Sequence, residues 1–150
     1  MFDLMQSLVV ATVMVAGTVL VHFWGLMALI RILGESSARR RARGSHFGQV
    51  SLILFVVFGI FALHTIEIWF YAVLYLSLGE MKALEPALYF STVTFVALGY
   101  GDIVLSPHWR LVSAIEAANG VILIAWSTTF MLSVTSRLRM LEHDWLDKPD

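Results

Sequence analysis

Four consecutive residues, Gly99-Tyr100-Gly101-Asp102, form a segment whose backbone could bind ions. The two glycines, one on each side of Tyr100, permit backbone conformations that regular structure forbids. An extended segment over residues 98–101 is expected to point successive carbonyl oxygens at one axis. Several copies around that axis would form rings of oxygens that replace the water shell of a cation. The segment therefore predicts a cation site built from backbone carbonyls.

The composition excludes a soluble globular protein. Of the 150 residues, 59% are hydrophobic and 14% are charged, and the net charge is −1. The mean hydropathy is +0.80. Soluble domains average about 25% charged residues, so this chain has too little polar surface to cover a core. The absence of cysteine excludes disulfide frameworks and thiolate metal sites.

Three apolar stretches are long enough to cross a bilayer, which takes about 20 helical residues. They cover residues 8–33, 50–78 and 111–134. The first stretch has no basic residues before it, so we expect it to be retained rather than cleaved as a signal peptide. A fourth stretch, 87–98, is too short to span and is typical of a re-entrant helix. Glu85 and Pro86 precede it and suit a helix N-terminus.

The expected fold is an all-α membrane protein with three transmembrane helices, a re-entrant pore helix and a filter loop. We divide the chain into a peripheral helix (1–34), a basic linker (35–47), a pore module (48–139) and a short cytoplasmic tail (140–150). Non-helical backbone at membrane depth is tolerated only where it is buried in protein or lines water. The loop after the short helix is therefore expected to line a pore.

Basic residues predict the orientation in a plasma (inner) membrane, because short loops rich in Lys and Arg stay in the cytoplasm. They cluster after the first and third spans, whereas the segment between spans two and three holds only Lys82 and Arg110. The N-terminus is thus expected outside and the C-terminus in the cytoplasm. The linker arginines are also candidates for contact with anionic lipids, and nucleic-acid binding is not expected. They are Arg39, Arg40, Arg41 and Arg43.

Residues 87–102 resemble, without gaps, the pore helix and filter of bacterial two-helix potassium channels. The Gly-Tyr-Gly-Asp segment carries the resemblance by identity, and Trp109-Arg110 and Gly120 resemble the start and the hinge glycine of the family's inner helix. It covers roughly residues 50–139, so the first span lies outside it. It implies a passive, potassium-selective homotetramer without enzymatic activity, with bound K⁺ as the only cofactor. The implied ion-binding carbonyls belong to Ala97, Leu98, Gly99, Tyr100 and Gly101.

The filter departs from the family pattern at its inner end. Ala97 and Leu98 stand where the family usually carries Thr and Val. Four hydroxyls would be missing from a tetramer, which should weaken the innermost ion site. A channel that passes monovalent cations without selection is therefore an alternative, and a non-conducting accessory or scaffold protein is a further one. We expect Ala97→Thr to change conductance or the sodium/potassium permeability ratio.

The surroundings of the filter depart from the pattern too. Val93 stands where some relatives place a carboxylate, so Asp102 lacks that partner, and the restraint on the filter must come from elsewhere. Tyr89 and Phe90 replace a pair of tryptophans. Glu116 should lie near the level of the filter. There it supports the pore helix or, indirectly, Asp102, or it makes a plain helix–helix hydrogen bond. The predicted supporting residues are Thr94, Asp102, Tyr89, Phe90 and Glu116.

The third span is expected to line the inner cavity. With Gly120 as the hinge, one helical stripe consists of Val121, Ile124, Thr128 and Leu132. An apolar stripe of this kind could gate by dewetting, or it could be ordinary helix packing. Asn119 could face either way.

Two of the spans carry buried polar residues. His64 and Glu67 lie at i, i+3 in the second span and share a face with Tyr71 and Tyr75. Because a lipid-facing Glu is expensive, this face should contact protein. The pair is either a structural contact or a pH sensor, since His titrates near neutral pH. In the first span, His22 shares a face with Ala11, Thr18 and Gly25. This face of small residues is expected to be a packing seam.

Overall fold

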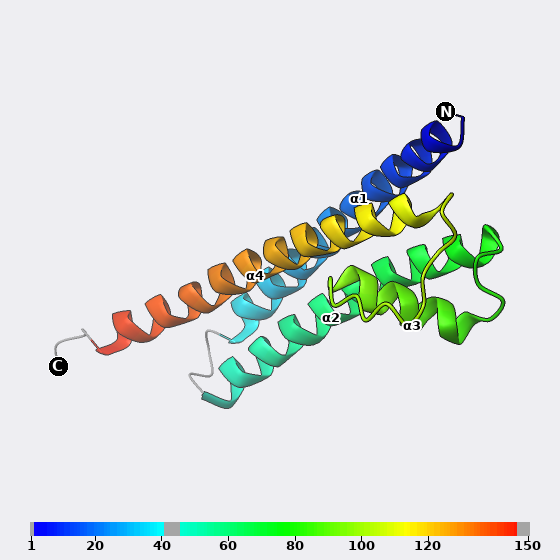
Figure 1. Cartoon of the computed structure of the whole chain (residues 1–150). Coiled ribbons are helices and arrows are strands. Elements are labelled where there is room, and N and C mark those ends of the chain that lie inside the picture. Colours follow the sequence, from blue (N-terminus) through cyan, green and yellow to red (C-terminus); the bar gives the residue numbers. More distant parts are fainter. Residues whose placement is uncertain (1, 41–45, 147–150) are drawn as a thin grey trace.

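The computed structural model describes residues 2–40 and 46–146, with side chains over 3–34 and 50–136. These described residues form four helices: α1 (Phe2–Arg40), α2 (His46–Ser77), α3 (Leu84–Phe95) and α4 (Arg110–Leu146) (Figure 1). The all-helical fold with three long helices and one short helix is the predicted one. Arg41 and Arg43 of the predicted lipid contact lie outside the described residues, as do the side chains of Arg39 and Arg40.

Three helices are long and apolar enough to cross a membrane. Their apolar parts are Asp3–Gly34, Val50–Ser77 and Arg110–Ser136, and an 18-residue window in each has a mean hydropathy of 2.1, 2.2 and 1.5, respectively. The three predicted spans are thereby confirmed, and the chain is a multi-pass membrane protein. At 12 residues, α3 is too short to span a bilayer of about 30 Å.

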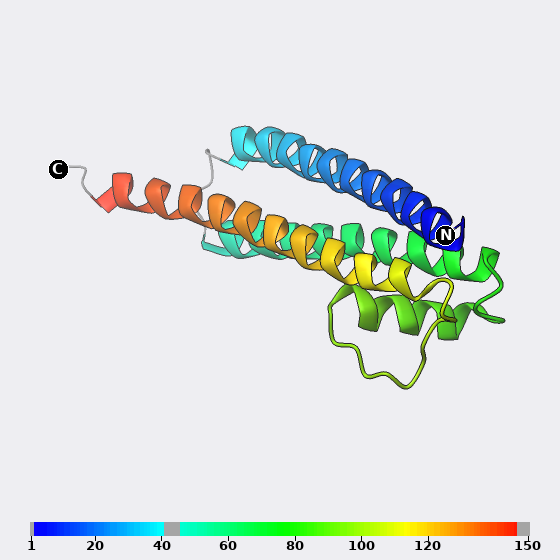
Figure 2. The ribbon, with the colours of Figure 1, turned by 45° about the horizontal axis from the view of Figure 1, so that its top comes forward.

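The three long helices run side by side, and α3 packs beside one end of α2 and α4 (Figure 1). Helix α1 packs against the same two helices from the other side (Figure 2). The loop between α3 and α4 hangs away from the helices. This arrangement makes α2 and α4 the central layer that connects the peripheral helix to the pore segment.

The seam between α1 and α2 is built from reciprocal glycines. The side chain of Leu63 on α2 fills the space beside Gly25, and Leu29 on α1 fills the space beside Gly59. Each glycine lets a leucine of the opposite helix approach its backbone, as is common between membrane helices. Ala11, Thr18 and His22 are fully buried. The predicted small-residue seam on α1 is therefore confirmed.

Candidate ion-conducting site

The pore helix α3 ends in a Schellman motif, in which the first two residues after the cap bond back to the last turn. The Ala97 N–H donates to the Thr94 carbonyl at 2.8 Å, and the Leu98 N–H donates to the Val93 carbonyl at 2.9 Å. The motif needs a left-handed residue after the cap, and Ala97 takes that position with φ 55°. Among the described residues it is the only non-glycine with positive φ. The backbone at Ala97 is therefore strained.

The filter loop is not the extended strand that we expected. Positive φ recurs at every second residue, with 55° at Ala97, 57° at Gly99 and 74° at Gly101. An extended strand would point successive carbonyls to opposite sides, so a filter whose oxygens share an axis needs a different backbone. Alternating the sign of φ supplies one, and glycine tolerates it best. The Gly-x-Gly spacing thus matches the observed backbone.

Because Ala97 is left-handed, we expect Ala97→Gly to be neutral or to stabilise the protein by about 1 kcal/mol. Ala97→Thr places a β-branched residue at φ 55° and should destabilise it. Thermal unfolding of the purified variants measures both effects. Ala118→Gly, on an exposed face of α4, is the control and should destabilise by about 1 kcal/mol. If Ala97→Gly destabilised the protein as much as Ala118→Gly does, the left-handed conformation of Ala97 would be wrong.

The filter loop lies on the surface of the single chain. Leu98 is 54% exposed and Tyr100 is 66% exposed. Behind the loop lies a cavity of about 340 Å³, whose wall on the helix side comes from α3 and α4. Thr94, one of the predicted supporting residues, lines this cavity together with Phe90 and Ala117. One chain therefore leaves the loop open on its outer side and incompletely packed on its inner side.

Asp102, which follows the filter, has a partner on the pore helix. The Tyr89 hydroxyl donates a hydrogen bond of 2.7 Å to Oδ2 of Asp102. The hydrogen bond offers a restraint on the filter that does not involve Val93, as we expected. Tyr89 lies outside the three spans, and its hydrogen bond to Asp102 raises the pKa of the tyrosine hydroxyl. The hydroxyl therefore remains a donor throughout the physiological pH range.

Removing this donor should loosen the outer end of the filter. We expect Tyr89→Phe to speed amide hydrogen exchange around Gly101 and Asp102 by roughly threefold, a modest effect because the bond is exposed to water. Wild type should show the same loosening only at high pH, because the bond is present below about pH 10 and is lost as pH rises through the raised pKa. Tyr100→Phe is the control, since no hydrogen bond joins its hydroxyl to the described part of the chain. Equal exchange in Tyr89→Phe and wild type would contradict the restraint.

Phe90 faces the helices rather than the filter mouth. It is 7% exposed and meets the Tyr75 ring edge-on, with 5.3 Å between the ring centroids. The two aromatic residues that replace the tryptophan pair therefore have different partners. Tyr89 restrains the filter end, and Phe90 anchors α3 to α2.

Glu116 is fully buried between three helices. Its Oε2 accepts a 2.5 Å hydrogen bond from the Tyr75 hydroxyl on α2, and its Oε1 lies 2.6 Å from Ser91 Oγ on α3. Ser91 Oγ also lies 3.0 Å from the carbonyl oxygen of Ile68. Ser91 has one hydrogen to donate, so both of its contacts are satisfied only if Glu116 is protonated and donates to Ser91. Both the contact with the pore helix and a helix–helix hydrogen bond are therefore present.

Gly120 lies directly against the C-terminal end of α3. A Cβ there would overlap the Phe95 carbonyl oxygen and lie 2.8 Å from the carbonyl carbon. Helix α4 runs from Arg110 to Leu146 without a break at Gly120. The glycine therefore has a packing role in this structure, and its role as a hinge stays a prediction.

The predicted cavity stripe lies on a face of α4 that points away from the other helices. Val121 is 50% exposed and Leu132 is 63% exposed, Thr128 is exposed and Ile124 is half-buried. Asn119, on the opposite face, donates to Thr18 Oγ1 of α1 at 2.8 Å. The stripe is free to line a pore, and that role stays a prediction.

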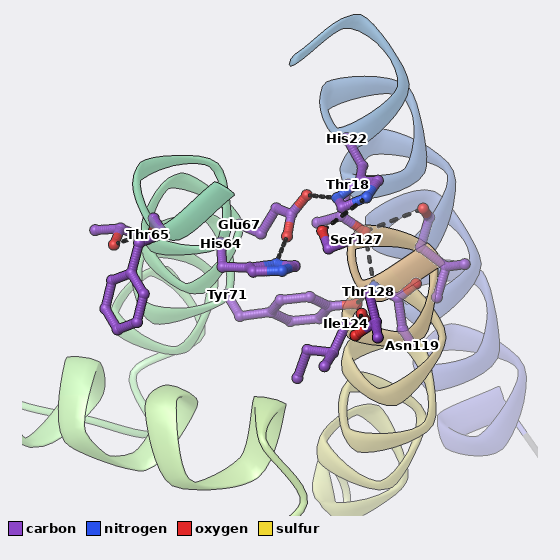
Figure 3. A network of polar contacts seen from close by, with 12 residues as sticks. Thr18, His22, His64, Thr65, Glu67, Tyr71, Asn119, Ile124, Ser127 and Thr128 are labelled. Atoms are coloured by element: carbon purple, nitrogen blue, oxygen red, sulfur yellow. Dashed lines mark hydrogen bonds and ion pairs between the residues drawn. The ribbon is translucent and has the colours of Figure 1, made fainter. Parts of the chain in front are cut away.

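His64 and Glu67 contact each other, and Glu67 also contacts a third residue, His22, which the sequence did not indicate as a partner (Figure 3). Glu67 Oε2 lies 2.8 Å from His64 Nδ1, and Glu67 Oε1 lies 2.8 Å from His22 Nδ1 on α1. The expectation that this face contacts protein is met, since Glu67 is fully buried. A role in pH sensing is not tested by these contacts.

Sequence reasoning missed two contacts at the end of the bundle where the filter lies. Glu80 accepts hydrogen bonds of 2.8 Å from both the N–H and the hydroxyl of Ser106. Ser7 of α1 donates to the carbonyl of His108 at 2.7 Å. Both contacts hold the segment that connects the filter to α4. No local signal identifies them, because the partners lie 26 and 101 residues apart.

A short helix that does not span, followed by a glycine loop and set between spanning helices, defines a pore segment. The sequence model of a family described as "Ion channel" matches residues 62–137. The chain belongs to this ion channel family and is not an enzyme. The match begins inside α2, so α1 lies outside it.

A curated relative is similar to part of this chain. The uncharacterized membrane protein YdjJ of Bacillus subtilis (strain 168) is 41% identical over 68 residues, which cover 40% of this chain and 19% of the relative. The chain thus spans about a fifth of that protein's length. No solved structure matches the chain.

Proposed function

We propose that the chain is the subunit of a homotetrameric, passive potassium channel. The carrying observation is the Gly99-Tyr100-Gly101 segment, which directly follows a non-spanning helix and has positive φ at both glycines. Carbonyl rings of this kind replace the hydration shell of a cation. K⁺ ions held by the carbonyls of residues 97–101 are the only bound species that the proposal requires. It includes the predicted orientation in the plasma (inner) membrane, with the N-terminus outside.

Four copies are needed because each chain carries one pore segment. The exposed filter loop supports this assembly, since irregular backbone at membrane depth is tolerated only where it is buried in protein or lines water, and the exposed Val121 and Leu132 are free for contact with another chain. Closing four chains around one axis would cover both features. Chemical cross-linking of the protein in native membranes, followed by sizing, counts the subunits.

A non-selective cation channel is the second candidate, and Ala97 favours it. This residue has no side-chain oxygen, so the innermost site depends on carbonyls alone. Its left-handed backbone also explains why Ser suits this position better than Thr as a test, because Ser carries a hydroxyl without β-branching. Ala97→Ser should therefore increase selectivity if the missing hydroxyl limits it.

The reversal potential in a planar bilayer, with K⁺ on one side and Na⁺ on the other, decides between these functions. A value near the potassium equilibrium potential supports the selective channel. A value near zero that moves toward the potassium potential in Ala97→Ser supports the non-selective channel. Intact tetramers that carry no current at any pH or lipid composition tested would instead support the non-conducting accessory or scaffold protein.

A further inference from the structure

Three side chains of types that can bind metal ions converge inside the apolar part of the bundle (Figure 3). His22 comes from α1, and His64 and Glu67 come from α2. One potential ligand atom from each lies within 4.8 Å of the other two. His22 and Glu67 are fully buried, and the side chain of His64 is 16% exposed. Ionisable groups within a membrane span are costly, so such a cluster calls for a functional explanation.

The Glu67 carboxyl group of the cluster meets no Lys or Arg in its described surroundings. With both imidazoles neutral, the net charge of the cluster is that of the Glu67 carboxylate. Within the described residues, the only ion-pair partners of Glu67 are His22 and His64, and no Lys or Arg reaches it. The remaining contacts come from α3 and α4, where the Phe95 and Trp126 rings and the Ser127 hydroxyl lie against the imidazoles. A buried carboxylate is stabilised by pairing with a cation or by coordinating a metal ion.

We propose that His22, His64 and Glu67 bind a divalent transition-metal ion of the Zn²⁺ type. Two imidazole nitrogens and one carboxylate oxygen are a common ligand set for such ions. In a tetrahedral site with bonds of about 2.0–2.1 Å, ligand atoms stand about 3.3 Å apart. The two Nδ1 atoms lie 2.8 Å from different oxygens of Glu67, and one ligand atom of each residue lies within 4.8 Å of the other two. Shifts of no more than about 1.5 Å therefore bring the three atoms to that spacing.

The surroundings of His22 suit a metal ligand. The Nδ1 atom faces the cluster, and Nε2 lies 3.4 Å from Ser127 Oγ on α4. When Nδ1 binds a metal ion, the ring hydrogen must sit on Nε2, where Ser127 is placed to accept it. A hydrogen-bond partner on the ring nitrogen that does not bind the metal orients a ligating histidine. Ser127 is therefore a positioning residue for the site.

Metal binding would attach α1 to the pore module, because the ion takes ligands from both. His22 lies in the helix outside the family match, whereas His64 and Glu67 lie inside it. The His64 ring is 5.6 Å from the ring of Phe95, the last residue of the pore helix. The proposal does not depend on ion selectivity, since the site is separate from the filter.

Metal content of the tag-free full-length protein tests the proposal. Protein in detergent is treated with Zn²⁺, passed through a desalting column and analysed by mass spectrometry. We expect about one Zn²⁺ per chain in wild type and about a tenth of that in His22→Gln and Glu67→Gln. His108→Gln, which removes a histidine outside the cluster, is the matched control and should retain about one. Ser127→Ala keeps all three ligands and should lower affinity about tenfold.

Co²⁺ provides a readout that does not depend on stoichiometry. Wild type and His108→Gln should show the visible spectrum of four-coordinate Co²⁺, and Glu67→Gln should not. Size-exclusion chromatography identifies variants that fail to assemble, and Ser127→Ala then carries the comparison. The proposal would be overturned if wild type held no Zn²⁺ after loading, or if wild type and His22→Gln held equal amounts of metal. A proton would then be the cation of the cluster.

Discussion

Replacing Gly120 with alanine is expected to destabilise the protein by about 3 kcal/mol, which is the upper end of the usual cost of overpacking. The substitution is also expected to suppress the current. The obstacle is the Phe95 carbonyl oxygen, which the new Cβ would overlap. This oxygen belongs to the backbone at the end of α3, so no side-chain rotation relieves the overlap. Either α4 or the end of the pore helix must move, and the filter begins two residues after Phe95. Thermal unfolding and bilayer current measure the two effects.

Gly17→Ala is the matched control for this substitution. A Cβ at Gly17 in α1 meets nothing within 4 Å, and the residue lies inside a helix. Alanine there should be neutral or stabilise by about 0.5–1 kcal/mol. If Gly120→Ala behaved like Gly17→Ala, the close contact between α4 and Phe95 would be wrong.

Glu116→Ala is expected to have an effect of similar size, about 3 kcal/mol of destabilisation, from a cavity and an orphaned buried hydroxyl. Glu116 connects Tyr75 of α2 to Ser91 of α3. Without it, the fully buried Tyr75 hydroxyl loses its acceptor. The pore helix also loses a link to α4, so the current should fall together with the unfolding temperature.

Glu116→Gln distinguishes the two protonation states of the carboxyl group. A protonated Glu116 donates to Ser91 and accepts from Tyr75, and a glutamine amide can make the same two bonds. We therefore expect Glu116→Gln to retain both stability and current. Tyr75→Phe, which removes the donor, should cost about 1 kcal/mol. A Gln variant as unstable as the Ala variant would mean that Glu116 is ionised.

The sequence alone determined the membrane architecture of this protein. Three apolar runs predicted the three spans, because crossing a bilayer depends on length and composition, which are properties of the segment itself. The short helix and the glycine loop were also predictable, because Gly99 and Gly101 specify local backbone freedom. The left-handed Ala97 was not, since alanine gives no signal for positive φ and the end of α3 imposes it.

Helical periodicity placed polar residues on a face without saying which helix the face meets. Asn119 was undecided in the sequence, and in the structure it contacts Thr18 of α1. Glu116 was expected near the filter, yet its two partners, Tyr75 and Ser91, come from different helices. The spacing of residues along one helix defines a direction, whereas partners depend on how the helices pack against each other.

Only the tertiary structure decided which side chains meet across the bundle. His22 and Glu67 are 45 residues apart, and the sequence assigned His22 only to a packing seam. The two become neighbours because reciprocal glycines bring α1 and α2 together in one register. Tyr89 and Asp102 likewise meet because the filter loop folds back beside the helix that precedes it. Such contacts depend on the relative position of whole elements, which no local pattern of residues encodes.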